Sequence, residues 1–515
     1  MSSRRLSALA ISCVAIPAAI LAGCGGGGGG TSSVDVGPAA AVPAGAAIYL
    51  DATVKPTGSA KSNADAALGK ILNTSDPGTK IISLIESQSK ADGHPVNYQQ
   101  DIAPWLGQKA GFFFTSLGTT SQGAAVVETT NPAASLAFAQ KASGDTATDP
   151  APRTYNGASY QVDKSSPSNV FGTVGNFLVD GDLAGFQAAV NASKGDSLGD
   201  SSDFKDAIGS LPSDRLGTVY TIPKNFIAAL GPSQFGQSQQ QLLEKTAGDS
   251  LNQPVAGALT ASADTIQIEA TGGSSGVSTP QSSLIGDVPS QAWLALGVGN
   301  LGDTVKRTLD QLKTSIPNFD SAVQQIQATT GSSLDQLTAA LGDAVIYVEG
   351  KTKSTLTGAL VVQTKSPSLT GRLLTQLQSF LQLGSRGIKP LRLSGGGTGF
   401  QIDNPAIAPA PLEIAQQGDK FVIGYGANSA ERTLAPAQKL SDAPSFAAAQ
   451  GQVSSLGTDL FLNFPPIFAL AGSSGAKASP GFVQAKPYLD ALSYLVTGSG
   501  SSGDKAEFKA VLGLK

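Results

Sequence analysis

The sequence predicts an α+β protein made of two tandem copies of one mixed unit, each mainly an antiparallel sheet with helices packed on it. Three observations support this prediction: an ordered series of internal matches, short β-rich runs between helical patterns, and a hairpin pattern at the end of each copy. Short gaps between successive strands favour antiparallel pairing, because a parallel pair needs a long crossover connection. With 515 residues, of which 41% are hydrophobic, the chain is long enough for two cores.

The first 23 residues have the pattern of a secretory signal peptide. Arg4 and Arg5 precede an apolar run of 16 residues, from 6 to 21, and small residues follow the run. The run is shorter than the ~20 residues that a transmembrane helix needs, and Pro17 interrupts it. Segment 1–23 is therefore predicted to be a lipoprotein signal peptide that is removed on export.

Cys24 ends the quartet LAGC, which resembles the bacterial lipobox. The resemblance implies cleavage just before Cys24 and attachment of diacylglycerol to its sulfur, whereas Cys13 lies too early in the apolar run. Segment 24–42 contains six consecutive glycines and is predicted to be a flexible tether. Because two or three acyl chains hold a protein firmly on a bilayer, we expect the protein to be lipid-anchored on the extracytoplasmic face of the cell membrane.

The composition limits the possible partners. Once the signal peptide is removed, Cys24 is the only cysteine, so no internal disulfide can form. Charged residues make up 14% of the sequence, below the ~25% of typical soluble domains. The formal net charge is −4, and removal of Arg4 and Arg5 makes it −6. A weakly acidic surface argues against nucleic acid and against electrostatic docking on anionic lipid, so the membrane contact is assigned to the acyl anchor.

Internal matches run in the same order through the two halves of the chain. PWLGQKAGFFF from Pro104 matches AALGDAVIYVE from Ala339, and GAAVVETT from Gly123 matches GALVVQTK from Gly358, both with an offset of 235 residues. Four further pairs complete the series with small changes in offset, and such an ordered set indicates a duplication. The predicted segments are a first α+β repeat at 43–271, a linker at 272–286 and a second α+β repeat at 287–515.

The first copy opens with the β-rich run AIYLDA and continues with two helical patterns. In SNADAALGKIL, apolar residues recur on one helical face behind a possible N-cap at Ser62. The stretch DPGTKIISLIE begins with Asp76 and Pro77, which suit an N-cap and a first helical turn. The runs GFFFTSL, AAVVETT, FLVDGD and TVYTI predict strands, and VAGALTASADTIQIEAT predicts a closing hairpin.

The second copy shows two stretches of helical periodicity and ends with LSYLVTGSGSSGDKAEFKAVLG, which predicts a hairpin. A helix uses one face for its core contacts, so apolar residues at this spacing predict helices that pack on the sheet. The periodic residues are Val305, Leu309, Leu312 and Ile316 in one stretch, and Leu369, Leu373, Leu377 and Phe380 in the other.

The order of several motifs resembles a known family. VPAGAAIYLDATVKP, DIAPWLGQKAGFFF, AAVVETTNP, FLVDGDLAGFQAAV and DSLGDSSDFKDAIGSLPSDRLGTVY follow one another as in a family of exported bacterial lipoproteins, known as domain of unknown function 3352. The resemblance covers nearly all of 42–515 and is strongest in the first copy, while the second has Ala340 in place of Trp105. It implies no activity, cofactor or catalytic residue.

GVGNLG at 297–302 fits the G-x-G-x-x-G pattern of dinucleotide-binding turns, and Asp320 lies near the usual distance for a ribose contact. A dinucleotide-binding fold needs a parallel strand after the helix that follows this turn, but a second helical pattern occupies that place. The corresponding turn of the first copy, DATVKPTG, also lacks the glycines. A structural turn is the favoured interpretation, and no cofactor is predicted.

GGSSG at 272–276 fits the pattern of a nucleophile elbow around Ser274, but VSTPQSS follows where a helix is required. We therefore interpret this stretch as linker. His94 is the only histidine and lies in a polar turn. Any Ser–His–acid triad or zinc site would depend on this single imidazole, so neither catalytic residues nor metal ligands are predicted.

Two further motifs have a structural and a functional interpretation. DGD at 180–182 is predicted to be a turn, because a calcium loop would need further oxygen ligands. Trp105 and Phe112–Phe114 form the densest aromatic cluster. Exposed rings often bind sugars, but strand alternation is expected to bury Phe112 and Phe114 on one face, and core packing is the prediction for the whole cluster, Trp105 included.

Three classes of function remain. The favoured class is a tethered, non-enzymatic binding protein for an apolar envelope ligand or a protein partner, with its site between the sheet and helices of a copy or between the copies. The alternatives are a cell-envelope hydrolase with a carboxylate-based site and a structural spacer. A binding protein requires a concave apolar site with few polar groups, whereas a spacer requires none.

Replacing Cys24 by serine is expected to leave the protein unprocessed or to release it from the membrane, because serine lacks the thiol that receives diacylglycerol. Membrane fractionation and mass spectrometry of the N-terminal peptide measure the effect. Cys13→Ser is the matched control and should leave acylation intact. Acyl-dependent membrane association that is unchanged in Cys24→Ser would contradict the lipobox prediction.

Overall fold

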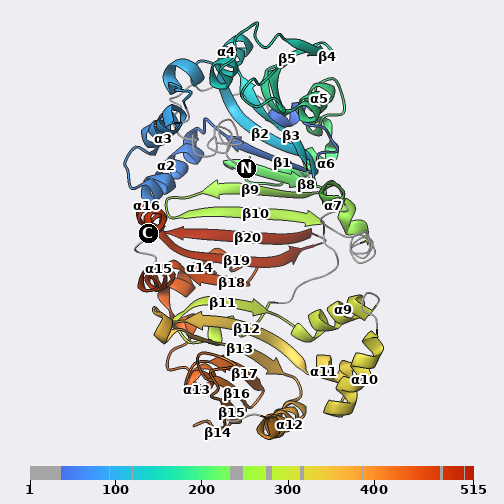
Figure 1. Ribbon diagram of the computed structural model, residues 1–515, viewed down its shortest axis with the longest axis vertical. Helices are drawn as coiled ribbons and strands as arrows, with labels where there is room; N and C mark the ends of the chain where they lie inside the picture. Colours follow the sequence, from blue (N-terminus) through green and yellow to red (C-terminus); the bar gives the residue numbers. More distant parts are fainter. Residues whose placement is uncertain are drawn as a thin grey trace. The chain divides into compact units, whose positions relative to one another are not determined.

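The computed structural model describes residues 36–91, 93–118, 120–231, 248–273, 281–313, 318–384, 387–475, 479–503 and 505–515. Cys24, the predicted signal peptide and Ser274 lie outside the described residues. The chain divides into two compact units (Figure 1). Unit 1 is Met1–Gly276 with Gly503–Ala506, and unit 2 is Val277–Ser502 with Glu507–Lys515.

The described strands of unit 1 pair in the order β10-β9-β8-β1-β2-β3-β7-β6-β5-β4, and every neighbouring pair is antiparallel. The chain therefore builds this sheet without a parallel crossover, as its short connections predict. The strands are β1 (Ile48–Thr53), β2 (Leu106–Leu117), β3 (Ser121–Thr129), β4 (Arg153–Tyr155), β5 (Ala158–Val162), β6 (Asn169–Val174), β7 (Phe177–Asp182), β8 (Gly217–Thr221), β9 (Val255–Ala261) and β10 (Thr265–Gly273).

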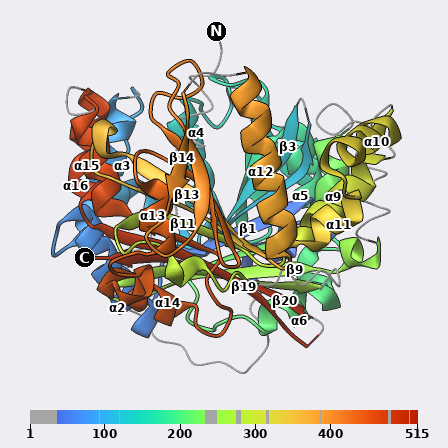
Figure 2. The ribbon, with the colours of Figure 1, turned by 90° about the horizontal axis from the view of Figure 1, so that it is seen from below.

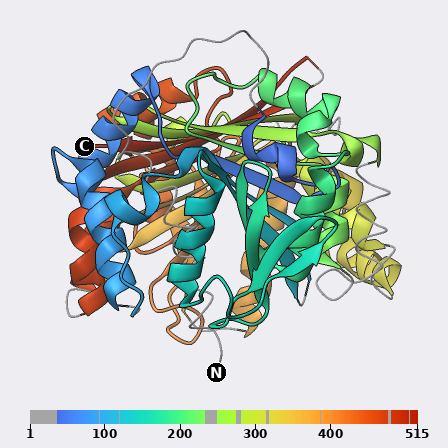
Figure 3. The same ribbon diagram turned by 90° about the horizontal axis from the view of Figure 1, so that it is seen from above.

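Several helices of unit 1 begin at a side chain that caps the first turn. The Asp76 carboxylate accepts a hydrogen bond from the backbone N–H of Thr79 at 3.0 Å, which confirms the predicted start of the second helix. These helices are drawn in blue to green in Figure 3. They are η2 (Gly37–Ala41), α2 (Gly58–Leu72), α3 (Pro77–Ala91), the π-turn η3 (Tyr98–Ile102), α4 (Pro132–Ser143), α5 (Leu183–Ala192), η4 (Leu198–Asp200), α6 (Ser202–Gly209), α7 (Pro223–Leu230) and η5 (Gly248–Asn252).

The main core of unit 1 lies on one face of the sheet, under α5 and α6. Tyr49 and Phe113 point from the central strands into this core, and both are fully buried. The Phe204 ring of α6 meets the Tyr49 ring edge-on, with centroids 5.8 Å apart. Fully burying an aromatic or aliphatic side chain contributes about 1.5–3 kcal/mol, so this face supplies much of the stability of unit 1.

The opposite face of the same sheet is covered only in part. There, α4 packs on Val127, Leu178 and Phe171 together with Trp105, which is 3% exposed. The burial of Trp105 agrees with the prediction that it belongs to a core. The described helices leave the rest of this side uncovered over the central strands β8, β1, β2, β3 and β7, where Leu50 is 40% exposed. We call this part the open face, and the corresponding part of unit 2 has the same name.

The described strands of unit 2 pair in the order β20-β19-β18-β11-β12-β13-β17-β16-β15-β14. Among strands β11 through β19, every described pair of neighbouring strands is antiparallel. The strands are β11 (Ala292–Val298), β12 (Leu341–Glu349), β13 (Thr357–Thr364), β14 (Ile388–Arg392), β15 (Thr398–Ile402), β16 (Leu412–Gln417), β17 (Lys420–Tyr425), β18 (Leu460–Asn463), β19 (Leu492–Ser502) and β20 (Lys505–Leu514).

The helices of unit 2 again divide between the two faces of the sheet. One face carries the main core, with Tyr347, Phe446 and Phe461 fully buried. On the other face, α12 packs through Leu374 on Phe400. The helices are η6 (Ile285–Asp287), α9 (Leu301–Lys313), α10 (Phe319–Thr330), α11 (Leu334–Ala339), η7 (Lys353–Thr355), α12 (Pro367–Gly384), α13 (Ser429–Leu434), η8 (Leu440–Asp442), α14 (Pro444–Gln452), α15 (Phe464–Ser473) and α16 (Pro480–Leu489).

The two strand orders correspond one to one, from β10 and β20 at one end to β4 and β14 at the other. A short antiparallel bridge recurs as well, joining Pro43 to Ser197 in unit 1 and Pro289 to Lys439 in unit 2. The boundary between the units, after Gly276, falls within the segment predicted as linker. These shared pairings are what a tandem repeat requires, and the duplication itself stays a prediction.

Several sequence predictions are wrong in detail. The helix predicted to start at Ser62 begins at Gly58 behind Thr57, because the turn after β1 already adopts helical geometry. Residues 180–182 are the end of strand β7 rather than a turn, and the Asp182 carboxylate caps α5 by accepting from the N–H of Gly185 at 2.9 Å. Within the linker predicted at 272–286, Leu284 and Ile285 belong to the core of unit 2.

The aromatic cluster is also arranged differently from the prediction. Phe112 and Phe114 share a face, but Phe113 is the ring that enters the main core. Phe112 and Phe114 are only partly buried on the open face, where their centroids lie 6.4 Å apart. Strand alternation shows which residues share a face, but it does not show which of two apolar faces is covered by helices. The sequence therefore could not show that Phe113, rather than Phe112 and Phe114, enters the main core.

An ion pair between a buried carboxylate and a half-exposed guanidinium connects α13 to the sheet of unit 2. Glu349 of β12 is 1% exposed, and its carboxylate meets the guanidinium of Arg432 from α13. Burial raises the pKa of Glu349, and Arg432 opposes this effect. Next to the pair, the hydroxyls of Tyr347 and Thr433 share a hydrogen bond of 2.7 Å.

Arg432→Met is expected to lower the free energy of unfolding by about 1–3 kcal/mol at pH 8, because it leaves the Glu349 carboxylate buried without a cation, while the half-exposed Arg432 makes the pair weaker than a fully buried one. The native pKa of Glu349 then rises further above its unfolded value, so the loss grows as pH increases and shrinks toward pH 5. Denaturant unfolding at both pH values measures the effect. The double variant Glu349→Gln/Arg432→Met is the control and should recover most of the loss; equal losses in both variants would refute the role of the pair.

Candidate functional site

The open face of unit 2 carries a continuous row of aliphatic side chains. Five strands contribute one residue each, and the backbone registers place these residues directly opposite one another. We call this set the aliphatic row, and it consists of Leu460, Leu296, Ile346, Leu360 and Ile423. Three of its members are substantially exposed, namely Leu296 at 39%, Ile346 at 45% and Ile423 at 38%.

The central strands of unit 2 are thus apolar on both faces. The strand neighbours of the row point the other way and are fully buried, as Ala295, Tyr347 and Val422 show. An antiparallel sheet usually keeps one solvated face polar. A contiguous apolar face that no helix covers is typical of a surface that binds another molecule.

Helices border the aliphatic row. At one end, α12 contacts β14, β15 and β16 (Figure 2), and its Leu374 is buried against Ile414 of β16. Along its side, α9 and α11 contact β12, where Ala344 is 4% exposed. The row therefore lies beside these helices on the sheet surface, and the predicted site between the sheet and helices of a copy stays a prediction.

The open face of unit 1 carries the corresponding row, with a different chemistry. We call it the mixed row, and it consists of Val219, Leu50, Phe112, Ala125 and Asp180. Leu50 is 40% exposed, while Phe112, Val219 and Asp180 are partly buried. Asp180 occupies the strand position that Ile423 holds in the aliphatic row, so one carboxyl group distinguishes the two rows.

Asp180 lies in apolar surroundings. Its partners across the sheet are Ala125 of β3 and Phe171 of β6. Burial, together with the smaller effect of the nearby charge of Asp163, raises the pKa of Asp180 to about 7. Within the described part of the chain, no cation or hydrogen-bond donor engages its side chain, in contrast with Asp163, which accepts from the N–H and the hydroxyl of Ser165 at 2.7 Å.

A second buried carboxyl group, Asp51 of β1, lies on the main-core side and is engaged. The Tyr49 hydroxyl donates to it at 3.1 Å. Burial raises the pKa of Asp51, while Lys109 and the Thr218 hydroxyl lower it. These partners satisfy Asp51 within the fold, so its role is structural.

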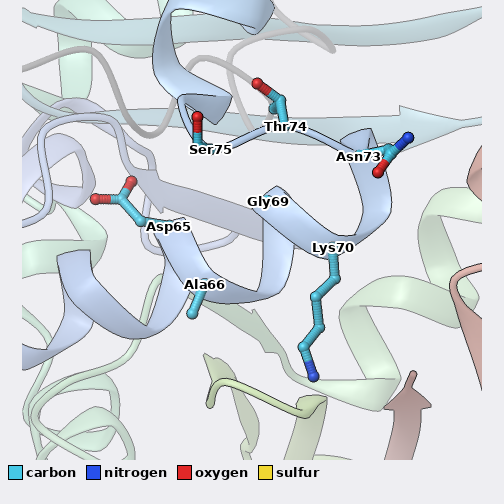
Figure 4. Close-up of a pocket in the computed structure, with 7 residues that line it drawn as sticks. All are labelled: Asp65, Ala66, Gly69, Lys70, Asn73, Thr74 and Ser75. Atoms are coloured by element: carbon cyan, nitrogen blue, oxygen red, sulfur yellow. The ribbon is translucent and has the colours of Figure 1, made fainter.

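A shallow polar hollow lies at the end of α2 (Figure 4). Its two charged groups are already paired, Asp65 with Lys61 at 2.6 Å and Lys70 with Asp264. The hollow therefore has a mixed polar and apolar lining and offers no free charge. Its lining residues are Asp65, Ala66, Gly69, Lys70, Asn73, Thr74 and Ser75.

The other motifs of the sequence are structural elements here. Strand β11, which contains the first glycine of GVGNLG, pairs antiparallel with β12 and β18, and α9 leads into a second helix. Asp320 pairs with Lys313 at 3.5 Å. His94 is partly buried in the loop after α3. Within the described ranges, no three His, Cys, Asp or Glu side chains form a cluster that could hold a metal ion.

Sequence reasoning missed the open face. Its residues have the ordinary alternation of β-strands, and only the uneven placement of helices exposes one of the two apolar faces. The matched runs gave no signal for the difference, because with Phe177 opposite Phe421 they place Asp180 opposite Gly424 rather than Ile423. Only the strand pairings bring Asp180 and Ile423 to corresponding positions.

The sheet and its helices define an α+β protein. The family described as "Protein of unknown function (DUF3352)" matches residues 79–507. The chain belongs to this family, as its motif order predicted, and the description assigns no activity. No helix of the described ranges is long and apolar enough to cross a membrane.

The other comparisons add little. Among curated proteins, none matches the sequence. Two solved structures, "Structure of crystal form I of TP0453" and "Structure of crystal form IV of TP0453", are 11% and 12% identical to this chain. Each match covers 78% of this chain, and 96% and 95% of the respective structures, with TM-scores of 0.18 and 0.16. Scores this low carry no argument about this protein.

Asp180→Asn is expected to stabilise the protein at pH 8. The folded pKa of about 7 exceeds the ordinary value of 3.8, so stability falls as pH rises from about 4 to 7. Since the side chain is partly exposed, we expect a gain of only about 1–2 kcal/mol at pH 8 and none at pH 4. Thermal unfolding at both pH values tests this, with the exposed Asp214→Asn as control. A destabilised Asp180→Asn at pH 8 would disprove the desolvation of Asp180.

Proposed function

We propose that this protein is a non-enzymatic binding protein for an apolar envelope ligand, tethered through Cys24 to the extracytoplasmic face of the cell membrane. The observation that carries the proposal is the aliphatic row, an exposed apolar surface bordered by helices. Ligand sites for apolar molecules are predominantly hydrophobic and contain few polar groups, and the row has none.

The shape of the aliphatic row favours a linear occupant. Five adjacent strands at about 4.8 Å spacing give a row about 19 Å long that runs across the strands. A long alkyl chain can follow such a line in van der Waals contact with each side chain. At about 25 cal/mol per Å² of apolar area removed from water, covering the row would stabilise a complex without any polar contact.

A protein partner is the alternative occupant. The row lies in the middle of the sheet, where the strands already pair on both sides, so an added β-strand cannot bind by backbone hydrogen bonds. A partner would have to place apolar side chains of a helix or loop on the row. The linear, uninterrupted arrangement of aliphatic groups favours the alkyl chain.

Ile346→Glu is expected to weaken binding of 1-dodecanol at least tenfold, because it places a carboxylate at the centre of the aliphatic row. Val483→Glu on α16 is the matched control, since Val483 is 57% exposed but lies outside the row. Titration calorimetry of the purified, delipidated protein measures both affinities.

The proposed function fails if the wild-type protein binds no 1-dodecanol, or if the two variants lose affinity equally. Native mass spectrometry of protein purified from its own envelope adds an independent test. A co-purifying alkyl-chain molecule supports the proposal, whereas a stoichiometric polypeptide would replace it with the protein partner.

A further inference from the structure

The mixed row and the aliphatic row occupy corresponding positions in the two sheets, and they differ in charge at one position. Leu50 corresponds to Leu296, Phe112 to Ile346 and Ala125 to Leu360, as the strand pairings show. At the next strand, unit 1 has Asp180 and unit 2 has Ile423. A carboxylate costs several kcal/mol to bury without a partner, so its place on an apolar face requires an explanation.

We propose that the mixed row of unit 1 binds an alkyl-chain molecule that carries an amine, with its chain along Leu50 and Phe112 and its cationic head on the Asp180 carboxylate, whereas the aliphatic row of unit 2 binds the alkyl chain alone. The proposal rests on the proposed function, which supplies the apolar part of the ligand. It adds the chemistry of the head group and a division of specificity between the units.

No positively charged side chain of the described ranges pairs with Asp180, so the cationic group of a ligand can occupy that position. Ala125 and Phe171, its neighbours across the sheet, carry no charge. On the adjoining helix α4, the basic residue of the last turn is Lys141, which pairs with Asp101 at 2.6 Å. No protein cation of the described ranges therefore neutralises Asp180.

The other acids of this region are already held by the fold. Asp145 accepts from the N–H of Lys164 at 3.3 Å, and Asp182 accepts from the N–H groups of Gly123 and Gly185 at 2.7 and 2.9 Å. Asp163 is engaged by Ser165 and adds negative potential near Asp180. An ammonium group is complementary to this arrangement, whereas a carboxylate head is repelled.

The protonation of Asp180 and of the ligand amine predicts that amine binding depends on pH. Asp180 loses its proton near pH 7, while an alkylamine stays protonated well above that pH, as the lysine side chain does. The charge-assisted pair is therefore complete above about pH 7, and amine binding is expected to strengthen as pH rises from 5 to 8.

The experiment compares dodecylamine with 1-dodecanol, which has the same chain, by titration calorimetry at pH 8. Asp180→Asn is expected to lower the dodecylamine affinity about tenfold and to leave the 1-dodecanol affinity within about twofold, because a charged hydrogen bond is lost while the apolar contact remains. Ile423→Asp is the matched reciprocal variant and should create a second amine site in unit 2. Dodecanoate should bind unit 1 more weakly than either probe.

The outcomes separate this inference from the function on which it rests. An unchanged ratio of dodecylamine to 1-dodecanol affinity in Asp180→Asn overturns the inference alone, provided that wild-type protein binds 1-dodecanol. Binding of neither probe overturns both. Because Asp180→Asn removes a poorly solvated charge, the variant is expected to fold, and a thermal unfolding curve at pH 8 checks this directly.

Discussion

The antiparallel ladder that runs through β8, β1, β2, β3 and β7, and again through their counterparts in unit 2, determines the rest of the structure. Its registers align residues of five strands in straight rows, and its alternation assigns each row to one face. Both faces are apolar at the centre, so the helices decide which rows become core. The same strand pairing therefore produces both the main core, on the face that helices cover, and the open face on the other side.

Helix placement is in turn fixed by local polar contacts. In unit 1, Asp182 ends β7 and caps α5, which directs that helix onto the main-core face. In unit 2, the pair of Glu349 and Arg432 holds α13 on the equivalent face. Helices α4 and α12 each pack at one end of the opposite face. Among the described residues nearer its centre, Leu50 in unit 1 and Ile346 in unit 2 are 40% and 45% exposed. The candidate site is therefore formed by what the helices leave exposed.

The difference between Asp180 and Ile423 shows how two similar units can diverge in chemistry without a change in backbone. In place of the wholly aliphatic surface of unit 2, unit 1 has an apolar surface with an aromatic ring, Phe112, and a desolvated carboxyl group, Asp180. In the part of the chain that the structure describes, no three His, Cys, Asp or Glu side chains form a cluster that could hold a metal ion. Among the described residues, the open faces offer apolar contact as their main interaction.

The sequence by itself determined the α+β class, the family, the closing hairpins and the helix that follows Asp76, because alternation, helical periodicity and capping depend on nearby residues. It also placed Trp105 in a core. Only the tertiary structure decided that Phe113 is buried while Phe112 faces outward, and that Asp180 ends a row with Leu50. Those outcomes depend on which apolar face receives helices and on pairings between distant strands, and neither is encoded in the local pattern of a single strand.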